Sequence, residues 1–278
     1  MDKAYLDTLP PLRDVIRDHS LRAEKALGQN FIMDLNITDK ITGAAGDLNG
    51  YNVFEIGPGP GGLTRSLLRS DAKKVCAVEF DPRAIGALQD LKEKAGGRLQ
   101  LIHGDALKAD LTELSPSPRK IVANLPYNIS TVLLLNWLRQ EFYSPGSFDG
   151  MTLMFQKEVA ERICSPAGVK AYGRLAVMAQ WLCHVHIAFD LPPTAFVPPP
   201  KVTSSIVQIS PRAYDASRPD FKLMEEVTAA AFNQRRKMIR SSLKKYEDAL
   251  KQINIDETLR AEQLSVDDFI NICLHIKQ

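Results

Sequence analysis

The chain has 278 residues, 45% of them hydrophobic, which is enough for one large domain and a smaller one without covalent cross-links. Its four cysteines are scattered without a CxxC spacing, so neither a disulfide framework nor a zinc cluster is indicated, and a reducing, cytoplasmic setting is expected. A net charge of +2 is too small to indicate a nucleic-acid partner by itself, residues 1–19 lack a secretory signal, and no stretch reaches the roughly 18 apolar residues of a membrane span.

Short apolar runs alternate with helical patterns through the first 155 residues. The runs that read as buried strands are 52–56, 74–79, 99–103, 120–123 and 151–155. Apolar residues recur at helical spacing between them, at 62–70, 82–94 and 130–140. This alternation predicts an α/β fold with a parallel sheet, right-handed crossovers and helices on both faces. Ligands of such sheets bind beyond the carboxyl ends of the strands.

The pattern changes after residue 155. Two further helices are expected, at 156–163 and 174–182. The apolar runs 184–189 and 204–210 can pair as a terminal hairpin, with the prolines confined to the connection between them. Strand signals stop after Pro211 and short helices follow. The expected division is a large domain, 1–210, and a small helical domain, 211–278.

A glycine-rich motif, EIGPGPGG at 55–62, closes the first predicted strand and opens a helix. Glycines at 57, 59 and 61 let the backbone turn tightly and approach a ligand closely. Gly57, Gly59 and Gly62 also satisfy the GxGxxG dinucleotide fingerprint. The alternative is a strand-to-helix turn without a ligand.

Carboxylates end the next two predicted strands. Glu79 lies 22 residues after Gly57, close to the position where an acid takes ribose hydroxyls. Asp105 ends the third strand, where it can accept a hydrogen bond from an adenine amino group, although an aspartate in a GD turn also serves as a turn residue or helix cap. Together they indicate an adenosine-bearing cofactor, either a nicotinamide dinucleotide or S-adenosylmethionine.

The turn NLPY at 124–127 distinguishes these two cofactors. Pro126 fixes the local backbone, so Asn124 is expected to hold its side-chain oxygen toward the cleft above the sheet. A base amine can donate one hydrogen bond to this oxygen and one to a main-chain carbonyl. These two bonds favour a pyramidal nitrogen, whose lone pair can attack a sulfonium methyl. The attack then needs only positioning and electrostatics. Tyr127 offers a face for base stacking. The alternative is a structural turn in which Asn124 caps the next helix and Tyr127 packs on the core.

Eight motifs in order carry a family resemblance: ALGQNFIMD (26–34), EIGPGPGGLT (55–64), AVEFDP (77–82), GDAL (104–107), NLPY, YGRLAV (172–177), FVPPPKVTSSIV (196–207) and AFNQRRKMIRSSL (231–243). Together they closely resemble the bacterial small-subunit ribosomal RNA adenine dimethyltransferases, through about nine-tenths of the chain. The resemblance implies a Rossmann-like methyltransferase domain that uses S-adenosylmethionine, with a small helical domain behind it. It also implies dimethylation of N6 on two adjacent adenines in a hairpin near the 3' end of 16S rRNA, with a role in small-subunit biogenesis.

Site residues follow from the resemblance by motif. The implied cofactor residues are Asn30, Ile32, Gly57, Gly59, Glu79, Asp105 and Asn124. The implied catalytic residues are Asn124, Leu125 through its backbone, Pro126, Tyr127 and Phe196. Phe196 is expected to stack on the second face of the target base, and the alternative is that it anchors its loop. No metal is expected, and His184 and His186 are interpreted as structural.

A basic segment at 234–245, QRRKMIRSSLKK, contains six basic residues and no acid. Arg236, Arg240 and Lys244 recur every four residues, which places them on one face of a helix. Such a run is often a solvated helix face, but with the resemblance we expect it to contact rRNA phosphates. The predicted RNA-binding residues are Arg235, Arg236, Lys237, Arg240 and Lys244, with Arg22 and Lys25 as weaker candidates.

Two rival functions remain open, and a monomer without a membrane partner is the expected state for each. One is a large-subunit rRNA methyltransferase that confers antibiotic resistance and shares an NxPY-type motif. The other is a catalytically idle RNA-binding factor of the same fold. VPPPKV and QRRKMIR favour the small-subunit enzyme, and Glu79, Asp105 and NLPY argue against the idle factor.

Overall fold

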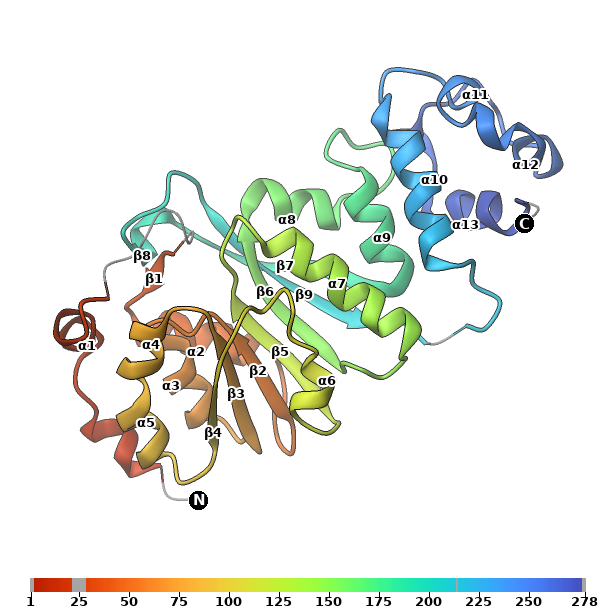
Figure 1. The fold of residues 1–278 in the computed structure, drawn as a ribbon. Coiled ribbons are helices and arrows are strands. Elements are labelled where there is room, and N and C mark those ends of the chain that lie inside the picture. The colour runs from red at the N-terminus through yellow and green to blue at the C-terminus, as the bar shows by residue number, and fades with distance from the viewer. Residues whose placement is uncertain (1–2, 22–28, 214, 277–278) are drawn as a thin grey trace.

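The computed structural model describes residues 3–21, 29–213 and 215–276, and a seven-stranded mixed sheet forms its centre (Figure 1). The strand order is β4-β3-β2-β5-β6-β9-β7. The strands are β2 (Asn52–Ile56), β3 (Lys74–Glu79), β4 (Leu99–His103), β5 (Arg119–Asn124), β6 (Gly150–Gln156), β7 (Cys183–Leu191) and β9 (Ser204–Pro211). The first five in this order are parallel, and β7 and β9 form an antiparallel pair at the edge. The predicted parallel strands and terminal hairpin are therefore confirmed.

Helices cover both faces of the sheet, as predicted. They are α2 (Leu35–Ala44), α3 (Gly62–Arg69), α4 (Pro82–Ala87), α5 (Gln89–Lys94), α6 (Leu111–Leu114), α7 (Ser130–Tyr143), α8 (Lys157–Cys164) and α9 (Arg174–Leu182). Side chains alternate across β2, so Phe54 and Ile56 join a core with α7 and α9, and Val53 joins a second core with α2 and α3. The helical pattern predicted at 82–94 is divided at Leu88 into α4 and α5.

A second, two-stranded sheet joins segments that lie far apart in the sequence. It pairs β1 (Phe31–Ile32) with β8 (Phe196–Val197) in antiparallel register, Phe31 opposite Val197 and Ile32 opposite Phe196. The proline-rich connection after β7 therefore contains a strand, which the sequence did not predict. Two residues are too few to show an alternating pattern, and this pairing depends on a partner from the other end of the domain.

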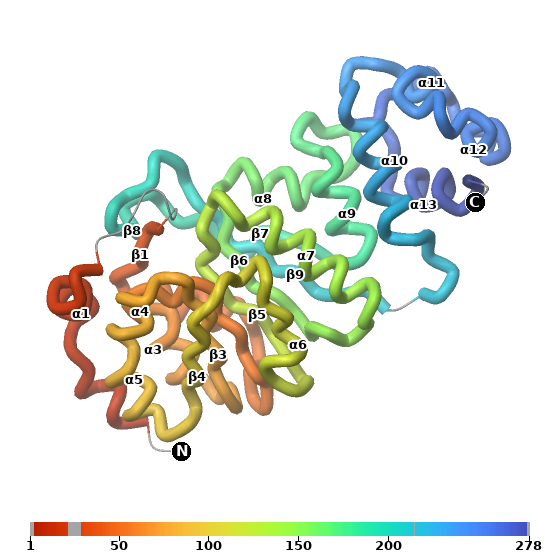
Figure 2. The backbone as a smooth tube through the Cα atoms, in the orientation of Figure 1, coloured from red at the N-terminus to blue at the C-terminus, as the bar shows by residue number. Residues whose placement is uncertain are grey.

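The N-terminal residues form two short helices, a 3-10 helix at Ala4–Thr8 and α1 at Leu12–Asp18. Four side chains of this segment, Leu6, Leu12, Val15 and Leu21, are buried. Figures 1 and 2 show α1 beside α4, at the end of the molecule opposite the C-terminal helices.

The C-terminal helices are α10 (Phe221–Asn233), α11 (Ile239–Ser242), α12 (Glu247–Gln252) and α13 (Val266–Leu274). They lie beyond α9 (Figures 1 and 2), and the hydrophobic core continues into them without interruption. The rings of Trp181 and Phe221, for example, are 5.9 Å apart. The division at residues 210 and 211 stays a prediction, and the small helical region packs firmly on the large one.

The basic segment 234–245 is not one helix, so the prediction that Arg236, Arg240 and Lys244 share a helical face was wrong. Helix α10 ends at Asn233, and Arg236 lies in the turn that follows. Met238 is extended and pairs with Arg260, which breaks the helical hydrogen bonding before α11. Arg240 lies in α11, and Lys244 begins a separate 3-10 helix, Lys244–Tyr246.

Within the described residues, no helix is long and apolar enough to cross a membrane.

Candidate functional site

A cavity of about 230 Å³ lies at the carboxyl ends of β2, β3 and β5, where the segment around β1 also reaches it. Because these strands are parallel, their carboxyl ends meet at one edge of the sheet. Ten predicted site residues line this cavity: Asn30, Ile32, Gly57, Gly59, Glu79, Asp105, Asn124, Leu125, Pro126 and Tyr127. The structure thus brings together residues from five separate motifs of the sequence.

The glycine-rich loop needs its glycines for close packing as well as for backbone conformation. Gly57 and Gly59 have φ angles of 68° and 53°, in the left-handed region that other residues rarely adopt. A Cβ atom on Gly59 would lie 2.8 Å from a ring carbon of Phe31 in β1. The loop therefore closes against β1, and a larger residue at position 59 would separate them.

Glu79 connects two of the loops that line the cavity. Its Oε2 accepts a hydrogen bond from the Gly59 amide at 3.2 Å, and its Oε1 accepts one from the Asp81 amide at 2.8 Å. Burial raises the pKa of Glu79, since only 5% of the residue is exposed. Each oxygen keeps a further lone pair, so the carboxylate can also accept hydrogen bonds from a ligand.

Asp105 begins a turn, in agreement with the alternative interpretation, and also lines the cavity. Its Oδ1 accepts a hydrogen bond from the Leu107 amide at 3.0 Å. The two interpretations are compatible, because this bond leaves the second carboxylate oxygen for other partners.

Asn124 is held by its amide nitrogen, which donates a hydrogen bond to the main-chain oxygen of Asn30 at 3.0 Å. The amide nitrogen of Asn124 is therefore used in a bond within the protein, and the side-chain oxygen can accept a hydrogen bond from a ligand. Asn124 does not cap the following helix: the N-cap position of α7 is Ile129, without a side-chain cap. The structural-turn interpretation of Asn124 as a cap is therefore wrong.

Tyr127 is half-buried and lines the cavity. A hydrogen bond of its hydroxyl group fixes the position of the ring. The phenol oxygen lies 2.6 Å from the hydroxyl oxygen of Ser204 in β9, whose side chain is fully buried. Burial raises the pKa of Tyr127, so its hydroxyl stays protonated at neutral pH. The ring is thereby tethered to the antiparallel edge of the sheet.

Among the cavity residues that the sequence analysis did not single out, Glu55 and Phe80 have the most distinctive environments. Glu55 is the first residue of the motif EIGPGPGG, is 1% exposed, and its Oε2 has no hydrogen-bond partner among the described residues. Burial raises the pKa of Glu55 to about 8, and the charge of Glu79 adds to the shift. An acid within the buried apolar strand NVFEI was the signal that could have identified it. Phe80 is the second, with 62% of a large apolar side chain exposed at the cavity.

Phe196 does not line the cavity in this structure. It is 2% exposed and belongs to the core that also contains Ile32, Met154 and Leu191. This position agrees with the loop-anchor alternative. A role in stacking on the target base stays a prediction, and it requires the ring to leave the core.

The predicted RNA-binding residues lie apart from the cavity. Arg236, Lys237, Arg240 and Lys244 are exposed, and no ion pair among the described residues involves them. Arg235 differs, because its guanidinium donates to the main-chain oxygens of Lys170 and Tyr172 at 2.7 and 3.0 Å and pairs with Glu262. It ties the C-terminal helices to the loop before α9. Arg22 and Lys25 lie outside the described residues.

Comparison with known proteins identifies close relatives along nearly the whole chain. A family model described as ribosomal RNA adenine dimethylase matches residues 20–278. The ribosomal RNA small subunit methyltransferase A of Allorhizobium ampelinum is 54% identical over 272 residues, which are 97% of this chain and 98% of that protein. The structure of a dimethyladenosine transferase from Plasmodium falciparum matches with a TM-score of 0.73 and 28% identity, over 86% of this chain and 94% of that one. The 23S rRNA methyltransferase ErmE shares the fold, with a TM-score of 0.67 and 23% identity over 90% of this chain and all of that one.

Proposed function

The chain belongs to the ribosomal RNA adenine dimethylase family, and on this basis we propose that it dimethylates N6 of two adjacent adenines in a hairpin near the 3' end of 16S rRNA. The family resemblance found in the sequence motifs is thus confirmed. The observation that carries the proposal is the contact between Asn124 and Asn30, which holds an acceptor oxygen in the same cavity as the glycine-rich loop and Glu79.

The cavity residues fit S-adenosylmethionine as the methyl donor. Gly57 and Gly59 allow the loop to approach the methionine portion, and Glu79 and Asp105 offer acceptors for the ribose hydroxyls and the adenine amino group. The exposed ring of Phe80 offers an apolar surface for the adenine. Glu55, protonated at neutral pH, supplies a buried hydrogen-bond donor. When bound, the cofactor supplies an electrophilic methyl group on a sulfonium.

The protein's contribution to the transfer is to hold the target amine. The Asn124 oxygen accepts a hydrogen bond from the amine, and the backbone at Leu125 accepts a second one, which together favour a pyramidal nitrogen with its lone pair free for attack. Pro126 stiffens the turn that sets these two acceptors. Tyr127, tethered through Ser204, provides the stacking face.

The substrate is the small ribosomal subunit or its precursor, and the modification forms part of subunit biogenesis. The exposed basic residues Arg236, Lys237, Arg240 and Lys244 contact rRNA phosphates, and this contact makes binding dependent on salt. The catalytic region is 1–210 and the RNA-binding region 211–278. The chain acts in the cytoplasm as a monomer.

The large-subunit alternative is less well supported. The likeness to ErmE lies below 25% identity and shows a shared fold. The 54% identical relative carries the small-subunit name. The catalytically idle alternative does not account for the held amide of Asn124 in a cavity with Glu79 and Asp105.

Methyl transfer to defined ribosomal particles tests the proposal. The protein is incubated with labelled S-adenosylmethionine and small subunits lacking the modification, with unmodified large subunits in a parallel reaction. Nucleosides are identified after digestion of the RNA. We expect N6,N6-dimethyladenosine in 16S rRNA. Label confined to large-subunit RNA, or no label in either particle, would contradict the proposed function.

A further inference from the structure

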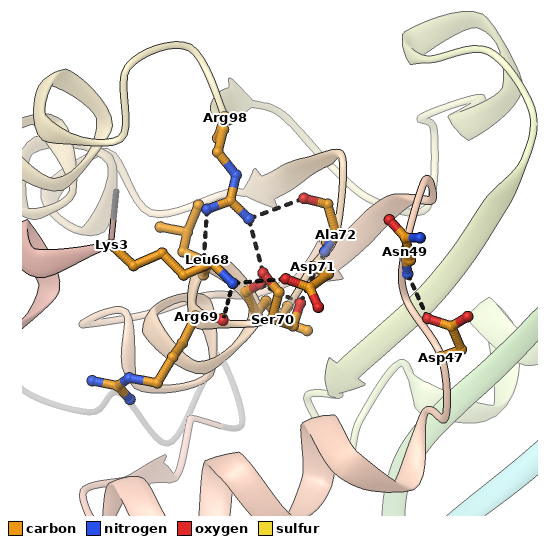
Figure 3. Close-up of polar contacts among 10 residues, drawn as sticks. Lys3, Asp47, Asn49, Leu68, Arg69, Ser70, Asp71, Ala72 and Arg98 are labelled. Atoms are coloured by element: carbon orange, nitrogen blue, oxygen red, sulfur yellow. Dashed lines mark hydrogen bonds and ion pairs between the residues drawn. The ribbon is translucent and has the colours of Figure 1, made fainter. Parts of the chain in front are cut away.

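The N-terminal segment, residues 3–21, follows α3 from its last turn to its first. At the last turn, Lys3 Nζ donates to the main-chain oxygen of Arg69 at 2.7 Å and to Asp71 at 2.9 Å (Figure 3). Near the first turn, Arg65, which is 6% exposed, donates to the main-chain oxygen of Pro10 at 2.8 Å. The family model matches residues 20–278, so almost all of this segment lies outside the match.

Leu12 of α1 packs directly against the start of the cofactor helix. A Cβ atom added to Gly62, the first residue of α3, would lie 3.2 Å from Leu12 Cδ1 and 2.7 Å from the main-chain oxygen of Ile32. Gly62 is thus held between α1 and β1 without space for a methyl group. Since the glycine-rich loop ends at this residue, Leu12 supports the end of the loop without being part of the cavity lining.

The same face of α1 also packs against α4, the helix that follows Glu79. Val15 and Leu21 form a small core with Ala84 and Ala87 of α4. Helix α4 begins directly after Asp81, whose amide is bonded to Glu79. Helix α1 therefore touches the elements that carry both the glycine-rich loop and Glu79, and Figures 1 and 2 show it beside α4.

We propose that residues 3–21 brace the cofactor site, and that Leu12 is a positioning residue for S-adenosylmethionine. The inference rests on the proposed function, because the brace acts on the binding of S-adenosylmethionine. Inside the cavity, two hydrogen bonds join the glycine-rich motif to the end of β3: the Gly59 amide donates to Glu79 at 3.2 Å, and the Gly57 amide donates to the main-chain oxygen of Val78 at 2.9 Å. Helix α1 holds them from outside, so that their spacing is set before the cofactor binds. Without helix α1, the cofactor must order the two loops when it binds. The free energy that this ordering costs lowers the affinity for S-adenosylmethionine.

Two leucines of the same segment form a matched pair for the test. Leu12 and Leu6 are both 5% exposed, so truncation to alanine removes a similar buried side chain at each position. Leu6 lies between Lys3 and Asp7, which contact Arg69 at the far end of α3. Leu12→Ala and Leu6→Ala in the full chain are compared with wild type by calorimetric titration with S-adenosylmethionine and by thermal unfolding.

Both variants are expected to lower Tm by roughly 5 to 10 °C, because each leaves a cavity. Only Leu12→Ala is expected to weaken cofactor binding, by about tenfold, within the range for packing changes away from a ligand. A merely structural segment would change Tm in both variants and Kd in neither. Wild-type affinity in Leu12→Ala, or an equal loss of affinity in Leu6→Ala, would overturn the brace.

A milder variant decides the question if Leu12→Ala does not fold. Val15→Ala removes less volume from the contact with α4 and is expected to weaken binding about threefold. A folded Val15→Ala with unchanged affinity would then reject the inference. If the wild-type chain itself does not bind S-adenosylmethionine, the proposed function fails, and the inference fails with it.

Discussion

Asn124 shows how a single hydrogen bond can assign a role to an amide. Its nitrogen donates to Asn30 at 3.0 Å, so the side chain cannot turn over without losing that bond and placing two oxygens together. The acceptor oxygen is therefore preorganised for a donor such as a base amine. Preorganised acceptors contribute to rate because they need no rearrangement as charge develops.

Replacement of Asn124 by alanine should separate binding from turnover. We expect Asn124→Ala to keep its affinity for S-adenosylmethionine within about tenfold and to lose most turnover, because the oxygen acts on the amine in the transition state. Asn136→Ala, in α7 and away from the cavity, is the control and should keep wild-type turnover. Titration calorimetry and methyl transfer measure the two effects. Wild-type turnover in Asn124→Ala would show that the turn has only a structural role.

Ser204 should matter for the rate through the tyrosine that it holds. The two hydroxyl oxygens lie 2.6 Å apart, so Ser204→Ala removes the tether of the Tyr127 ring. We expect kcat to fall roughly tenfold with cofactor affinity unchanged, and the free energy of unfolding to fall by about 1 kcal/mol.

Ser205, the neighbour of Ser204, provides the control. It is also fully buried, but its hydroxyl donates to Asp190 Oδ1 at 2.6 Å and not to Tyr127. Ser205→Ala should lower stability by a similar amount and leave kcat near the wild-type value. Equal kcat in the two variants would remove Ser204 from a role in positioning Tyr127.

At the level of the elements, the basic segment folds as a turn and two short helices. Pairing of Met238 with Arg260 breaks the expected helix and spreads Arg236, Arg240 and Lys244 over three different elements. The absence of a common helical face does not remove the charges from the surface, because all three residues are exposed. Their positions on the surface are set by the tertiary turn and not by helical periodicity.

Charge reversal in this segment should change the salt dependence of subunit binding. We expect Arg236→Glu with Arg240→Glu to weaken binding and to reduce the slope of log affinity against log salt by about 2, since each arginine neutralises one phosphate in the wild-type complex. Lys73→Glu with Lys92→Glu, at exposed positions directly before β3 and in α5, away from the C-terminal helices (Figure 1), serves as a control of equal charge change. Filter binding across a salt series gives the slopes. An unchanged slope in the first variant would return these residues to an ordinary solvated surface.

Across the molecule as a whole, one continuous core joins the sheet to the C-terminal helices. Arg235 and the bond from the Gly168 amide to the Glu262 oxygen, 2.7 Å long, add polar contacts across the same junction. The basic surface is thereby held in a constant relation to the cavity. The rRNA contact proposed for this surface would therefore have a fixed position relative to the cavity.

Glu55 makes the stability of the whole chain depend on pH. The pKa of its buried carboxyl rises from an ordinary value of 4.5 to about 8. Between these values the folded state holds a proton that the unfolded state has lost, so the free energy of unfolding falls as pH rises through this window. The slope from this group is at most about 1.4 kcal/mol per pH unit.

Thermal unfolding without cofactor at pH 6, 7 and 8 tests this dependence. We expect the Tm of the wild-type chain to fall over this range, and Glu55→Gln to show a weaker fall, because glutamine keeps the shape without the titration. Parallel curves for both proteins would exclude Glu55 as the source.

The amino-acid pattern alone was enough to predict the parallel sheet, the terminal hairpin, the family and ten of the residues around the cavity. These features depend on signals within a few neighbouring residues: apolar runs of strand length, glycines in a turn, acids at strand ends, and the rigid NLPY. Parallel strands then bring their carboxyl ends to one edge whatever the detailed packing. Ten residues could therefore be placed in one site before any contact was known.

Four features became visible only in three dimensions: the pairing of β1 with β8, the burial of Phe196, the broken basic segment and the raised pKa of Glu55. Each depends on a partner or a covering surface far away in the sequence, and such a contact leaves no periodic signal in the segment itself. The same holds for α1, whose place beside the glycine-rich loop and α4 is set by packing against both. Local patterns specify which element forms, and long-range contacts decide what that element touches.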